Sequence, residues 1–169
     1  MIENGSKCIL IGEGGVGKSS LLRLLQGEEI QIQRIPTIGV DVEKIEFEES
    51  LSVMVWDFGG QKRFQFLWDE WIKGSALTVI VTDSSEKNVS ETKIMLEKYG
   101  KKLGSDIIAI ANKQDLVGSL TPEEVSRRLG VKTYGMIAIK RSNMEAMRDI
   151  IFSQTKKELP LIKPGAVTA

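Results

Sequence analysis

Short apolar segments alternate with longer amphipathic segments along most of this chain. The apolar segments include KCILIG, ALTVIVTD and DIIAIAN, which are rich in β-branched residues and almost free of polar positions. The segments between them, such as KSSLLRLLQG and VSETKIMLEKYGKKLG, place apolar residues at helical spacing. Because strands of this kind are covered on both faces, the pattern predicts an α/β fold in which helices flank a mostly parallel sheet.

The remaining segments complete this arrangement. VDVEKIEF and LSVMVWD are separated only by Glu48-Glu49-Ser50, too short a link for a crossover helix, so we expect an antiparallel hairpin at one edge. TPEEVSRRLG begins with a capping box and ends at Gly130, which predicts a helix. YGMIAI is predicted as the last strand and SNMEAMRDIIFSQTKKEL as the last helix. We therefore expect six strands, one of them antiparallel at the edge, and about five helices.

The chain should form one domain over residues 1–159, with residues 160–169 as a tail. It has 23 Lys+Arg and 23 Asp+Glu, so its charge gives no reason to expect nucleic-acid binding. It has no His, which argues against zinc sites and Ser-His hydrolase chemistry. The single Cys8 lies in an apolar segment and favours a reduced, cytoplasmic setting. No lipid-anchor motif is evident, so any recruitment to membranes is expected to depend on partner proteins.

The segment GEGGVGKSS, at residues 12–20, fits the pattern G-x-x-x-x-G-K-[ST] between a predicted strand and a predicted helix. Backbone N–H groups of such a loop point at phosphate oxygens, and a β-carbon at Gly12 or Gly17 would crowd them. Lys18 is expected to reach the outer phosphates and Ser19 to bind Mg²⁺. The predicted nucleotide-binding residues of this phosphate loop are Gly12, Gly14, Gly15, Val16, Gly17, Lys18, Ser19 and Ser20.

The segment DFGGQ follows the strand LSVMVWD. Asp57 is predicted to contact Mg²⁺ through a water molecule. Gly60 offers an N–H group to the terminal phosphate, and Gln61 can orient an attacking water. Thr37 lies in RIPTIGVD, where Pro36 and Gly39 prevent a continuing helix. The Thr37 hydroxyl and N–H groups are predicted to bind Mg²⁺ and the γ-phosphate.

The tetrapeptide NKQD, Asn112 to Asp115, directly follows the strand segment DIIAIA. The Asp115 carboxylate can accept hydrogen bonds from both the ring N–H and the exocyclic amine of guanine, a donor pair that adenine lacks. Asn112 is expected to brace the neighbouring loops, and the Lys113 stem is expected to lie over the base. Together with the phosphate loop, this segment predicts GTP and GDP as the nucleotides.

These motifs, in this order, resemble the small GTPases of the Ras superfamily from about Lys7 to Leu159. IPTIGVDVE, VWDFGGQKRF, LWDEW and NKQDL are similar to the Arf and Arf-like branch, whereas GEGGVGKSS resembles the phosphate loop of the Ras and Rab branches. The resemblance implies the P-loop NTPase fold of small G proteins. It also implies a switch that binds GTP or GDP with Mg²⁺ and works with an exchange factor, a GTPase-activating protein and effector proteins.

The resemblance assigns further residues. Ala138 aligns with the loop that offers guanine a backbone N–H group, although its neighbours Ile137 and Ile139 depart from the family pattern. Arg34 lies three residues before Thr37, where G-protein α subunits place an arginine finger; an ordinary solvated arginine is the alternative.

Val40, Trp56 and Trp71 match an apolar effector triad of Arf-like proteins. Trp56 alternates with the inward Val55, so we expect it to face outward. The alternative is that the two tryptophans only pack the hairpin against the helix after Gln61.

The expected reaction is attack of water on the γ-phosphate of GTP, with Gln61, Lys18, Thr37 and Gly60 as the catalytic residues. Two alternatives remain open at this stage. The chain can be a GTP-bound scaffold that does not hydrolyse its nucleotide, which Gln61 opposes. It can also be an ATP-dependent P-loop enzyme, which Asp115 opposes.

Overall fold

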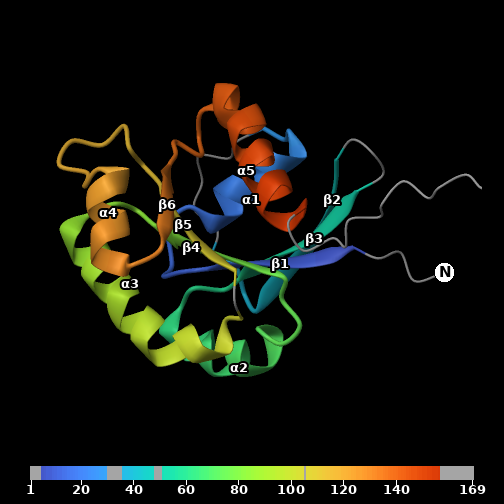
Figure 1. Ribbon diagram of the computed structural model, residues 1–169, viewed down its shortest axis with the longest axis horizontal. Coiled ribbons are helices and arrows are strands. Elements are labelled where there is room, and N and C mark those ends of the chain that lie inside the picture. The colour runs from blue at the N-terminus through green and yellow to red at the C-terminus, as the bar shows by residue number, and fades with distance from the viewer. Residues whose placement is uncertain (1–4, 30–35, 48–50, 105, 157–169) are drawn as a thin grey trace, which may run out of the picture.

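A six-stranded sheet with helices on both faces forms the body of the protein (Figure 1). The computed structural model describes residues 5–29, 36–47, 51–104 and 106–156. The predicted turn at residues 48–50, the predicted tail at 160–169 and the candidate finger Arg34 lie outside these described residues.

The strands are ordered β2-β3-β1-β4-β5-β6 in the sheet. Among the strands that the structure describes, the β2–β3 pair is antiparallel and every other pair is parallel. The predicted mostly parallel sheet with one antiparallel edge strand is thereby confirmed. The strand bounds are β1 Ser6–Ile11, β2 Val40–Glu46, β3 Ser52–Phe58, β4 Leu77–Thr82, β5 Ile107–Ala111 and β6 Lys132–Gly135.

Within the described residues, five α-helices connect or follow the strands, as predicted. Helices α1 and α5 lie on one face of the sheet, and α2 and α3 lie on the other (Figure 1). Their bounds are α1 Lys18–Gln26, α2 Trp68–Trp71, α3 Glu86–Tyr99, α4 Pro122–Leu129 and α5 Met144–Lys156. Short 3₁₀ helices run over η2 Lys62–Leu67, η3 Gly100–Lys102 and η4 Arg141–Asn143.

The predicted last strand, YGMIAI, is wrong for most of its length. Strand β6 spans Lys132–Gly135 and pairs with β5, whereas residues 136–139 form a loop. The apolar side chains of Met136 and Ala138 are buried without a strand, because hydrogen bonds to the Ala111 carbonyl and to the Asn112 side chain hold the loop against the end of β5. This loop contains the predicted base contact.

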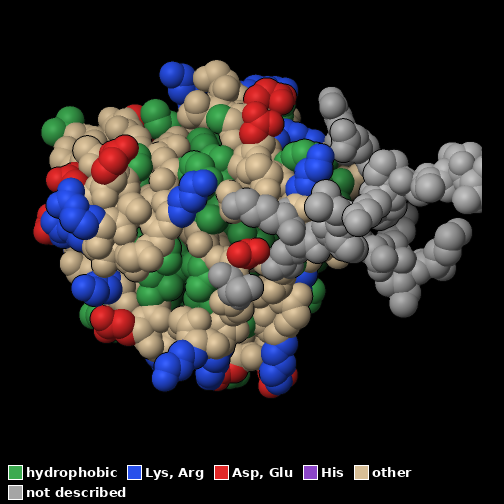
Figure 2. Space-filling view, in the orientation of Figure 1, with side chains coloured by type: hydrophobic (Ala, Val, Ile, Leu, Met, Phe, Trp, Pro, Cys, Tyr) green, Lys and Arg blue, Asp and Glu red, His purple; other side chains and the backbone are tan. Residues whose placement is uncertain are grey.

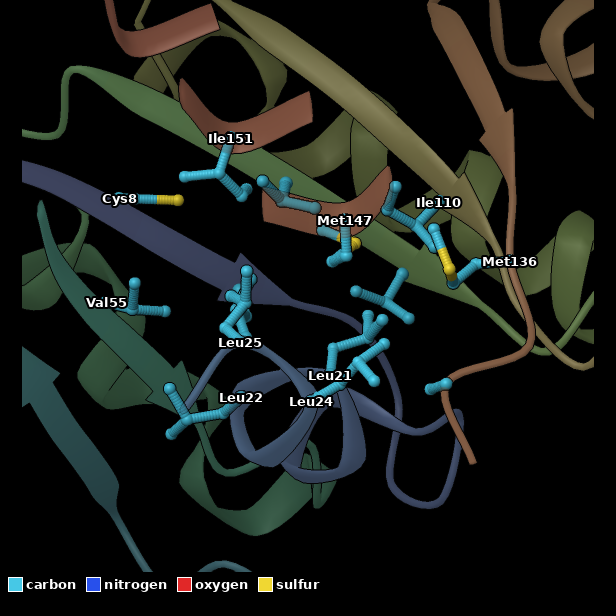
Figure 3. Packing of buried hydrophobic residues seen from close by; sticks show 14 of the residues in the cluster. Cys8, Leu21, Leu22, Leu24, Leu25, Val55, Ile110, Met136, Met147 and Ile151 are labelled. Carbon is cyan, nitrogen blue, oxygen red and sulfur yellow. The ribbon is translucent and has the colours of Figure 1, made fainter. Parts of the chain in front are cut away.

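Alternate residues of β1 face two separate hydrophobic cores. Cys8 and Leu10 pack with α1 and α5, whereas Ile9 and Ile11 pack with the side of the sheet that α2 and α3 cover. Figure 3 shows the first core, in which leucines of α1 meet Met147 and Ile151 of α5. Strand β1, which leads into the phosphate loop, is therefore covered on both faces, as its continuous apolar pattern predicts.

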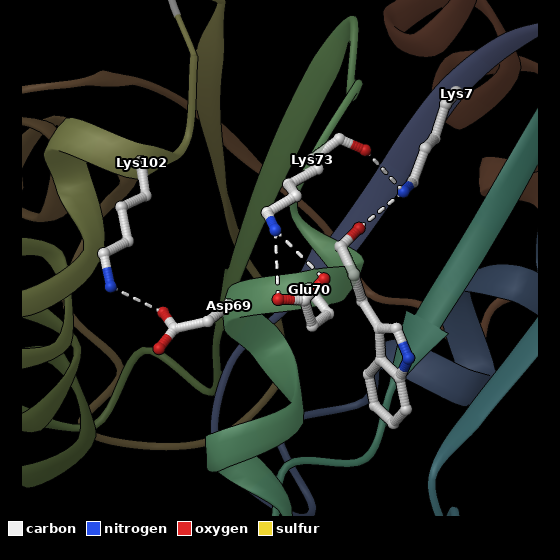
Figure 4. Close-up of polar contacts among 6 residues, drawn as sticks. Lys7, Asp69, Glu70, Lys73 and Lys102 are labelled. Carbon is white, nitrogen blue, oxygen red and sulfur yellow. Dashed lines mark hydrogen bonds and ion pairs between the residues drawn. The ribbon is translucent and has the colours of Figure 1, made fainter.

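The short helix α2 is tied to β1 by a lysine. The Lys7 ammonium group donates to the carbonyl oxygens of Trp71 at 2.5 Å and Lys73 at 2.9 Å (Figure 4). Carbonyl groups at the end of a helix lack partners within the helix, so Lys7 satisfies acceptors that α2 cannot. Partial burial of Lys7 lowers the pKa of its amine. The ion pair between Lys102 and Asp69 also joins η3 to α2, but both side chains are about half exposed and add little stability.

Candidate functional site

The predicted site residues gather where the parallel strands end. β1 leads into the phosphate loop, β3 contains Asp57 as its penultimate residue and β5 leads into Asn112. The connections from β1 and β4 leave the sheet on opposite faces, which is the usual place for a ligand in a sheet of this kind.

The N-terminus of α1 lacks a side-chain cap. Gly17 occupies the cap position with φ 106°, and the first turn of α1 contains no acidic residue. By contrast, α3 is capped by Ser85 and α4 by Thr121, the latter with the predicted capping box. Within the described chain, the N–H groups of Gly14, Gly15 and Gly17 have no hydrogen-bond acceptor. These free N–H groups and the helix dipole suit an anion.

Two glycines of the loop are required by the packing of the protein itself, in addition to the predicted approach of phosphate. A β-carbon at Gly12 would lie 2.4 Å from the Val81 carbonyl oxygen, and one at Gly17 would lie 2.2 Å from Asn112 Nδ2. Both glycines thus allow close packing of the loop on β4 and on Asn112. A β-carbon at Gly14 would meet nothing within 4 Å, so the open side of the loop is there.

Lys18 is buried beneath the loop. Its ammonium group donates to the carbonyl oxygens of Gly12 at 3.0 Å and Glu13 at 2.7 Å. Burial lowers the pKa of this amine to about 8, and the nearby Asp57 carboxylate opposes that shift. A cation held in this way is stabilised by any further negative charge that enters the loop.

Three oxygen-bearing side chains from separate segments meet next to Lys18. Ser19 Oγ donates to Asp57 Oδ2 at 2.5 Å and lies 3.0 Å from Thr37 Oγ1. Thr37 Oγ1 also lies 3.4 Å from Asp57 Oδ2. The structure therefore brings together the three residues predicted to bind metal, and Asp57 contacts Ser19 directly.

The oxygen donors at this point suit Mg²⁺. Asp57 is buried, and burial raises the pKa of its carboxyl group, while the Ser19 hydroxyl opposes that shift. Its Oδ1 atom has no hydrogen-bond partner within the described chain. The described residues contain no cluster of three or more Asp, Glu, His or Cys side chains that could hold a metal ion, so a cation here would be held by one carboxylate and the hydroxyls. Two hydroxyls and one carboxylate with a free oxygen fit a hard cation that keeps several waters.

Gly60 and Gln61 lie beside the phosphate loop. Gly59 donates its N–H to the Gly39 carbonyl at 2.7 Å, which joins this segment to the one that contains Thr37. Gln61 is half-buried, and its side chain makes no hydrogen bond within the described part of the chain. Its amide is thus available to a water molecule near the loop.

Asn112 bridges two loops. Its Nδ2 donates to the Val16 carbonyl at 2.9 Å, and its Oδ1 accepts from the Ala138 N–H at 3.0 Å. Lys113 spans the phosphate loop, since its amine donates to the Gly15 carbonyl at 2.7 Å. Asp115 is exposed and forms no hydrogen bond or ion pair within the described residues, so its carboxylate oxygens are free to accept donors. The Ala138 N–H already donates to Asn112 Oδ1. A hydrogen bond from it to the base would therefore require this N–H group to be shared between two acceptors.

The predicted effector triad is half-buried. Val40, Trp56 and Trp71 all pack against the second hydrophobic core. The Trp71 ring meets Phe58 with ring centroids 5.4 Å apart, and the Lys7 amine lies 4.0 Å from the Trp56 ring. The prediction that Trp56 faces outward therefore holds only in part, because β3 has apolar cover on both faces. Ile38, next to this group, is 77% exposed.

Several residues that shape the site were missed by the sequence analysis. Ser84 and Gln114 form hydrogen bonds around the guanine motif, Asn88 links α3 to the phosphate loop, and Trp68 is fully buried with its indole N–H on the Gly59 carbonyl at 3.3 Å. Only Trp68 had a sequence signal, because LWDEW places it one helical turn from Trp71.

Charged side chains of both signs are interspersed on the face shown in Figure 2, with apolar side chains between them. Among the helices that the structure describes, none combines the length and the apolar character needed to cross a membrane.

Comparison with known proteins gives one family. The sequence model of the ADP-ribosylation factor family matches residues 1–158. The chain is 34% identical over 131 residues to ADP-ribosylation factor-like protein 14 of Mus musculus. The aligned region covers 73% of this chain and 67% of that protein. It is 33% identical over 132 residues to ADP-ribosylation factor J of Dictyostelium discoideum, with 76% and 69% covered. It is 34% identical over 132 residues to ADP-ribosylation factor-like protein 4D of Bos taurus, with 73% and 66% covered.

Proposed function

Because the chain belongs to the ADP-ribosylation factor family, we propose that it is a molecular switch that binds GTP or GDP with Mg²⁺ and slowly hydrolyses GTP. The meeting of Ser19, Thr37 and Asp57 beside the uncapped start of α1 is the observation that supports this proposal best. It joins an anion site to a cation site, which is the combination that a nucleoside triphosphate with Mg²⁺ requires.

The phosphate loop would hold the phosphates through its free N–H groups. Lys18 would exchange its two carbonyl acceptors, Gly12 and Glu13, for phosphate oxygens or share its donors between them. Ser19 and Thr37 would supply hydroxyl ligands to Mg²⁺, with Asp57 as the carboxylate behind them. When bound, Mg²⁺ neutralises part of the charge on the phosphate oxygens.

Hydrolysis would use the segment after β3. The Gly60 N–H would approach the terminal phosphate, and the unpaired amide of Gln61 would orient water for in-line attack. We expect an intrinsic rate on the order of 10⁻⁴ to 10⁻² s⁻¹ unless a partner stimulates it. A role for Arg34 as an arginine finger stays a prediction.

The base would be selected by the loop after β5. Asp115 has free carboxylate oxygens, and Lys113 reaches the phosphate loop at the Gly15 carbonyl. A carboxylate satisfied by the two donors of guanine would be left unpaired by adenine, which favours GTP over ATP.

Protein partners are part of the proposal. Thr37 and Gly39 contact the segment of Gly59 and Gly60 directly, so a γ-phosphate that holds Thr37 would also influence the surface around Val40 and Trp71. Effectors are expected on that surface, together with an exchange factor and a GTPase-activating protein. We propose a cytoplasmic protein that reaches membranes through such partners.

Mass analysis of the nucleotide that copurifies with the protein tests the proposal. GDP, or a mixture of GDP and GTP, is expected, and competition binding should favour GDP over ADP by at least about a hundredfold. Copurified ADP would contradict the proposal and favour an ATP-dependent enzyme.

Single-turnover hydrolysis tests the enzymatic part. Gln61→Leu should slow hydrolysis by about tenfold or more with GTP affinity retained, because the amide would act on water in the transition state. Bound GTP that survives for days in the wild-type protein would instead favour a scaffold that does not hydrolyse its nucleotide.

A further inference from the structure

Ser84 lies two residues after the end of β4 and contacts the guanine motif. Its side chain is fully buried. Its Oγ donates to the Asn112 carbonyl oxygen at 2.6 Å and accepts from Gln114 Nε2 at 2.9 Å. Its own carbonyl oxygen accepts from the Leu120 N–H at 2.8 Å. Three hydrogen bonds thus join this one residue to the loop of residues 112–120, which contains Asp115.

Gln114 completes this connection. The same Nε2 group also donates to the Leu120 carbonyl at 3.0 Å, so the Gln114 side chain reaches both Ser84 and the far end of the loop. Gln114 turns inward, whereas its neighbour Asp115 is exposed. The two inward hydrogen bonds of Gln114 therefore attach the residue next to Asp115 to Ser84 and to Leu120.

The backbone of Ser84 is in an unusual conformation. Its φ is 67°, in the left-handed region, and it shares that region with only one other non-glycine residue of the described chain, Lys113 of the guanine motif itself. Glycine would adopt this φ without strain but would have no hydroxyl group. A strained residue whose side chain makes two buried hydrogen bonds is typical of a position where the side chain has a task.

The same hydrogen bonds continue to the phosphate loop. The Ser84 N–H donates to Thr82 Oγ1 at 3.2 Å, and Thr82 Oγ1 donates to Asn88 Oδ1 at 2.6 Å. Asn88 Nδ2 in turn lies 3.4 Å from Glu13 Oε2. The end of β4 is therefore a common frame to which the phosphate loop and the guanine motif are both attached.

We propose that Ser84 is a positioning residue for base selection, which acts through Asn112 and Gln114 to aim the Asp115 carboxylate at the paired donors of guanine. The inference rests on the proposed function. A bidentate contact requires two aligned hydrogen bonds, and it tolerates a displacement of only about 0.5 Å. Loss of the Ser84 hydroxyl would leave the Asn112 carbonyl without its partner and would remove one of the two acceptors of Gln114 Nε2, so the loop would be held less firmly.

The test compares GDP with inosine diphosphate, which keeps the ring N–H of guanine but lacks its exocyclic amine. Both affinities are measured by displacement of a fluorescent GDP analogue. Wild-type protein should prefer GDP by about ten- to a hundredfold, the value of one charge-assisted hydrogen bond. Ser84→Gly and Ser84→Ala should each lower that ratio by about fivefold or more, mainly through weaker GDP binding.

The two variants separate the hydroxyl from the backbone strain. Glycine relieves the strain at φ 67° and alanine keeps it, so a common fall in the ratio identifies the hydroxyl as the cause. Ser90→Ala is the matched control, because the Ser90 hydroxyl bonds only to Glu86 within its own helix. Melting temperatures measured in parallel report any general loss of stability.

Several outcomes would overturn the inference. An unchanged ratio, with both nucleotides bound equally less well, would give Ser84 a merely structural role. A fall of the affinity ratio in Ser84→Ala but not in Ser84→Gly would show that backbone strain, and not the lost hydroxyl, causes the effect. If neither Ser84 variant folds, Gln114→Leu removes the same link, and an unchanged ratio there also counts against the inference. Wild-type protein that binds neither nucleotide would instead refute the proposed function.

Discussion

The backbone of Gly60 packs directly on the peptide between Glu13 and Gly14. A β-carbon at position 60 would lie 2.4 Å from the Glu13 carbonyl carbon and 2.5 Å from the Gly14 nitrogen. These neighbours are backbone atoms, which cannot move aside as a flexible side chain can. The residue before Gln61 is thus held against the phosphate loop only because it has no side chain.

Gly60→Ala should therefore push Gln61 away from the loop. We expect single-turnover GTP hydrolysis to fall by about tenfold or more, while GDP affinity changes by less than about threefold because the base contacts are remote. Gly100→Ala is the control, since a β-carbon there meets nothing within 4 Å and its φ is −52°. Equal hydrolysis rates in both variants would contradict the packing argument.

Chelation of Mg²⁺ should release GDP. The oxygens of Ser19, Thr37 and Asp57 lie within 3.4 Å of one another, and the free Asp57 Oδ1 gives the ion a negative partner. Excess chelator should accelerate GDP dissociation from the wild-type protein by about ten- to a hundredfold. GDP should dissociate quickly from Ser19→Ala at any Mg²⁺ concentration, so chelator should accelerate its release much less than in the wild type. Ser153→Ala, on the exposed surface of α5, should release GDP in response to chelator as the wild type does. A full response in Ser19→Ala would exclude Ser19 as a ligand.

The pH dependence of stability should reveal the carboxylate pair of Glu13 and Glu91. Burial and then Glu91 raise the pKa of Glu13, and Lys62 opposes the shift. A carboxyl group with a raised folded-state pKa takes up its proton more readily in the folded state, so the pair destabilises the protein at neutral pH and does so less as the pH falls. Glu91→Gln should thus raise the melting temperature slightly at pH 7.5, with less gain near pH 5.

Glu97→Gln provides the comparison for this pair, because Glu97 is an exposed residue on the same helix. It should change the melting temperature little at either pH. A gain in Glu91→Gln that is equal at pH 7.5 and pH 5 would show that charge repulsion with Glu13 is not its source.

Trp71 and Ile38 should separate packing from partner binding. Trp71→Ala should lower the free energy of unfolding by about 2 kcal/mol or more, because its half-buried ring contacts Phe58 and the second core. Ile38→Ala should change it by less than about 0.5 kcal/mol, since Ile38 is 77% exposed. If this surface binds effectors, Ile38→Ala should weaken GTP-dependent capture of partners at unchanged nucleotide affinity. Denaturant unfolding and pull-down assays measure the two effects.

Much of the fold could be predicted because local signals and the global arrangement agree. The capping box of Thr121 and Glu124 and the C-terminal Gly130 set the bounds of α4, and each depends on residues a few positions apart. The buried strands could be predicted from their continuous runs of apolar residues. The last strand was mispredicted because the apolar residues Met136 and Ala138 are buried in a loop, and periodicity alone cannot distinguish that from a strand.

The motifs of the site could be recognised, but the supporting contacts could not. The phosphate loop and NKQD combine particular residues at fixed spacing, so their chemistry is visible in one dimension. In the sequence, Ser84 looks like any polar residue. Its contact with Asn112 forms only in the folded sheet, because the two residues are far apart in the chain. The close packing of Gly12 on Val81 likewise depends on the pairing of β1 with β4.

The unequal cover of the sheet also divides the molecule by local stability. β1 and β4 are paired on both sides and enclosed by apolar side chains, whereas β2 is paired only with β3 and has mostly exposed or half-buried positions. Amide protons of β1 and β4 should therefore exchange with solvent only through global unfolding, and those of β2 through smaller openings that cost less free energy. The part of the sheet around β1 and β4, which would bind the nucleotide, can therefore stay folded while the part around β2 changes its conformation.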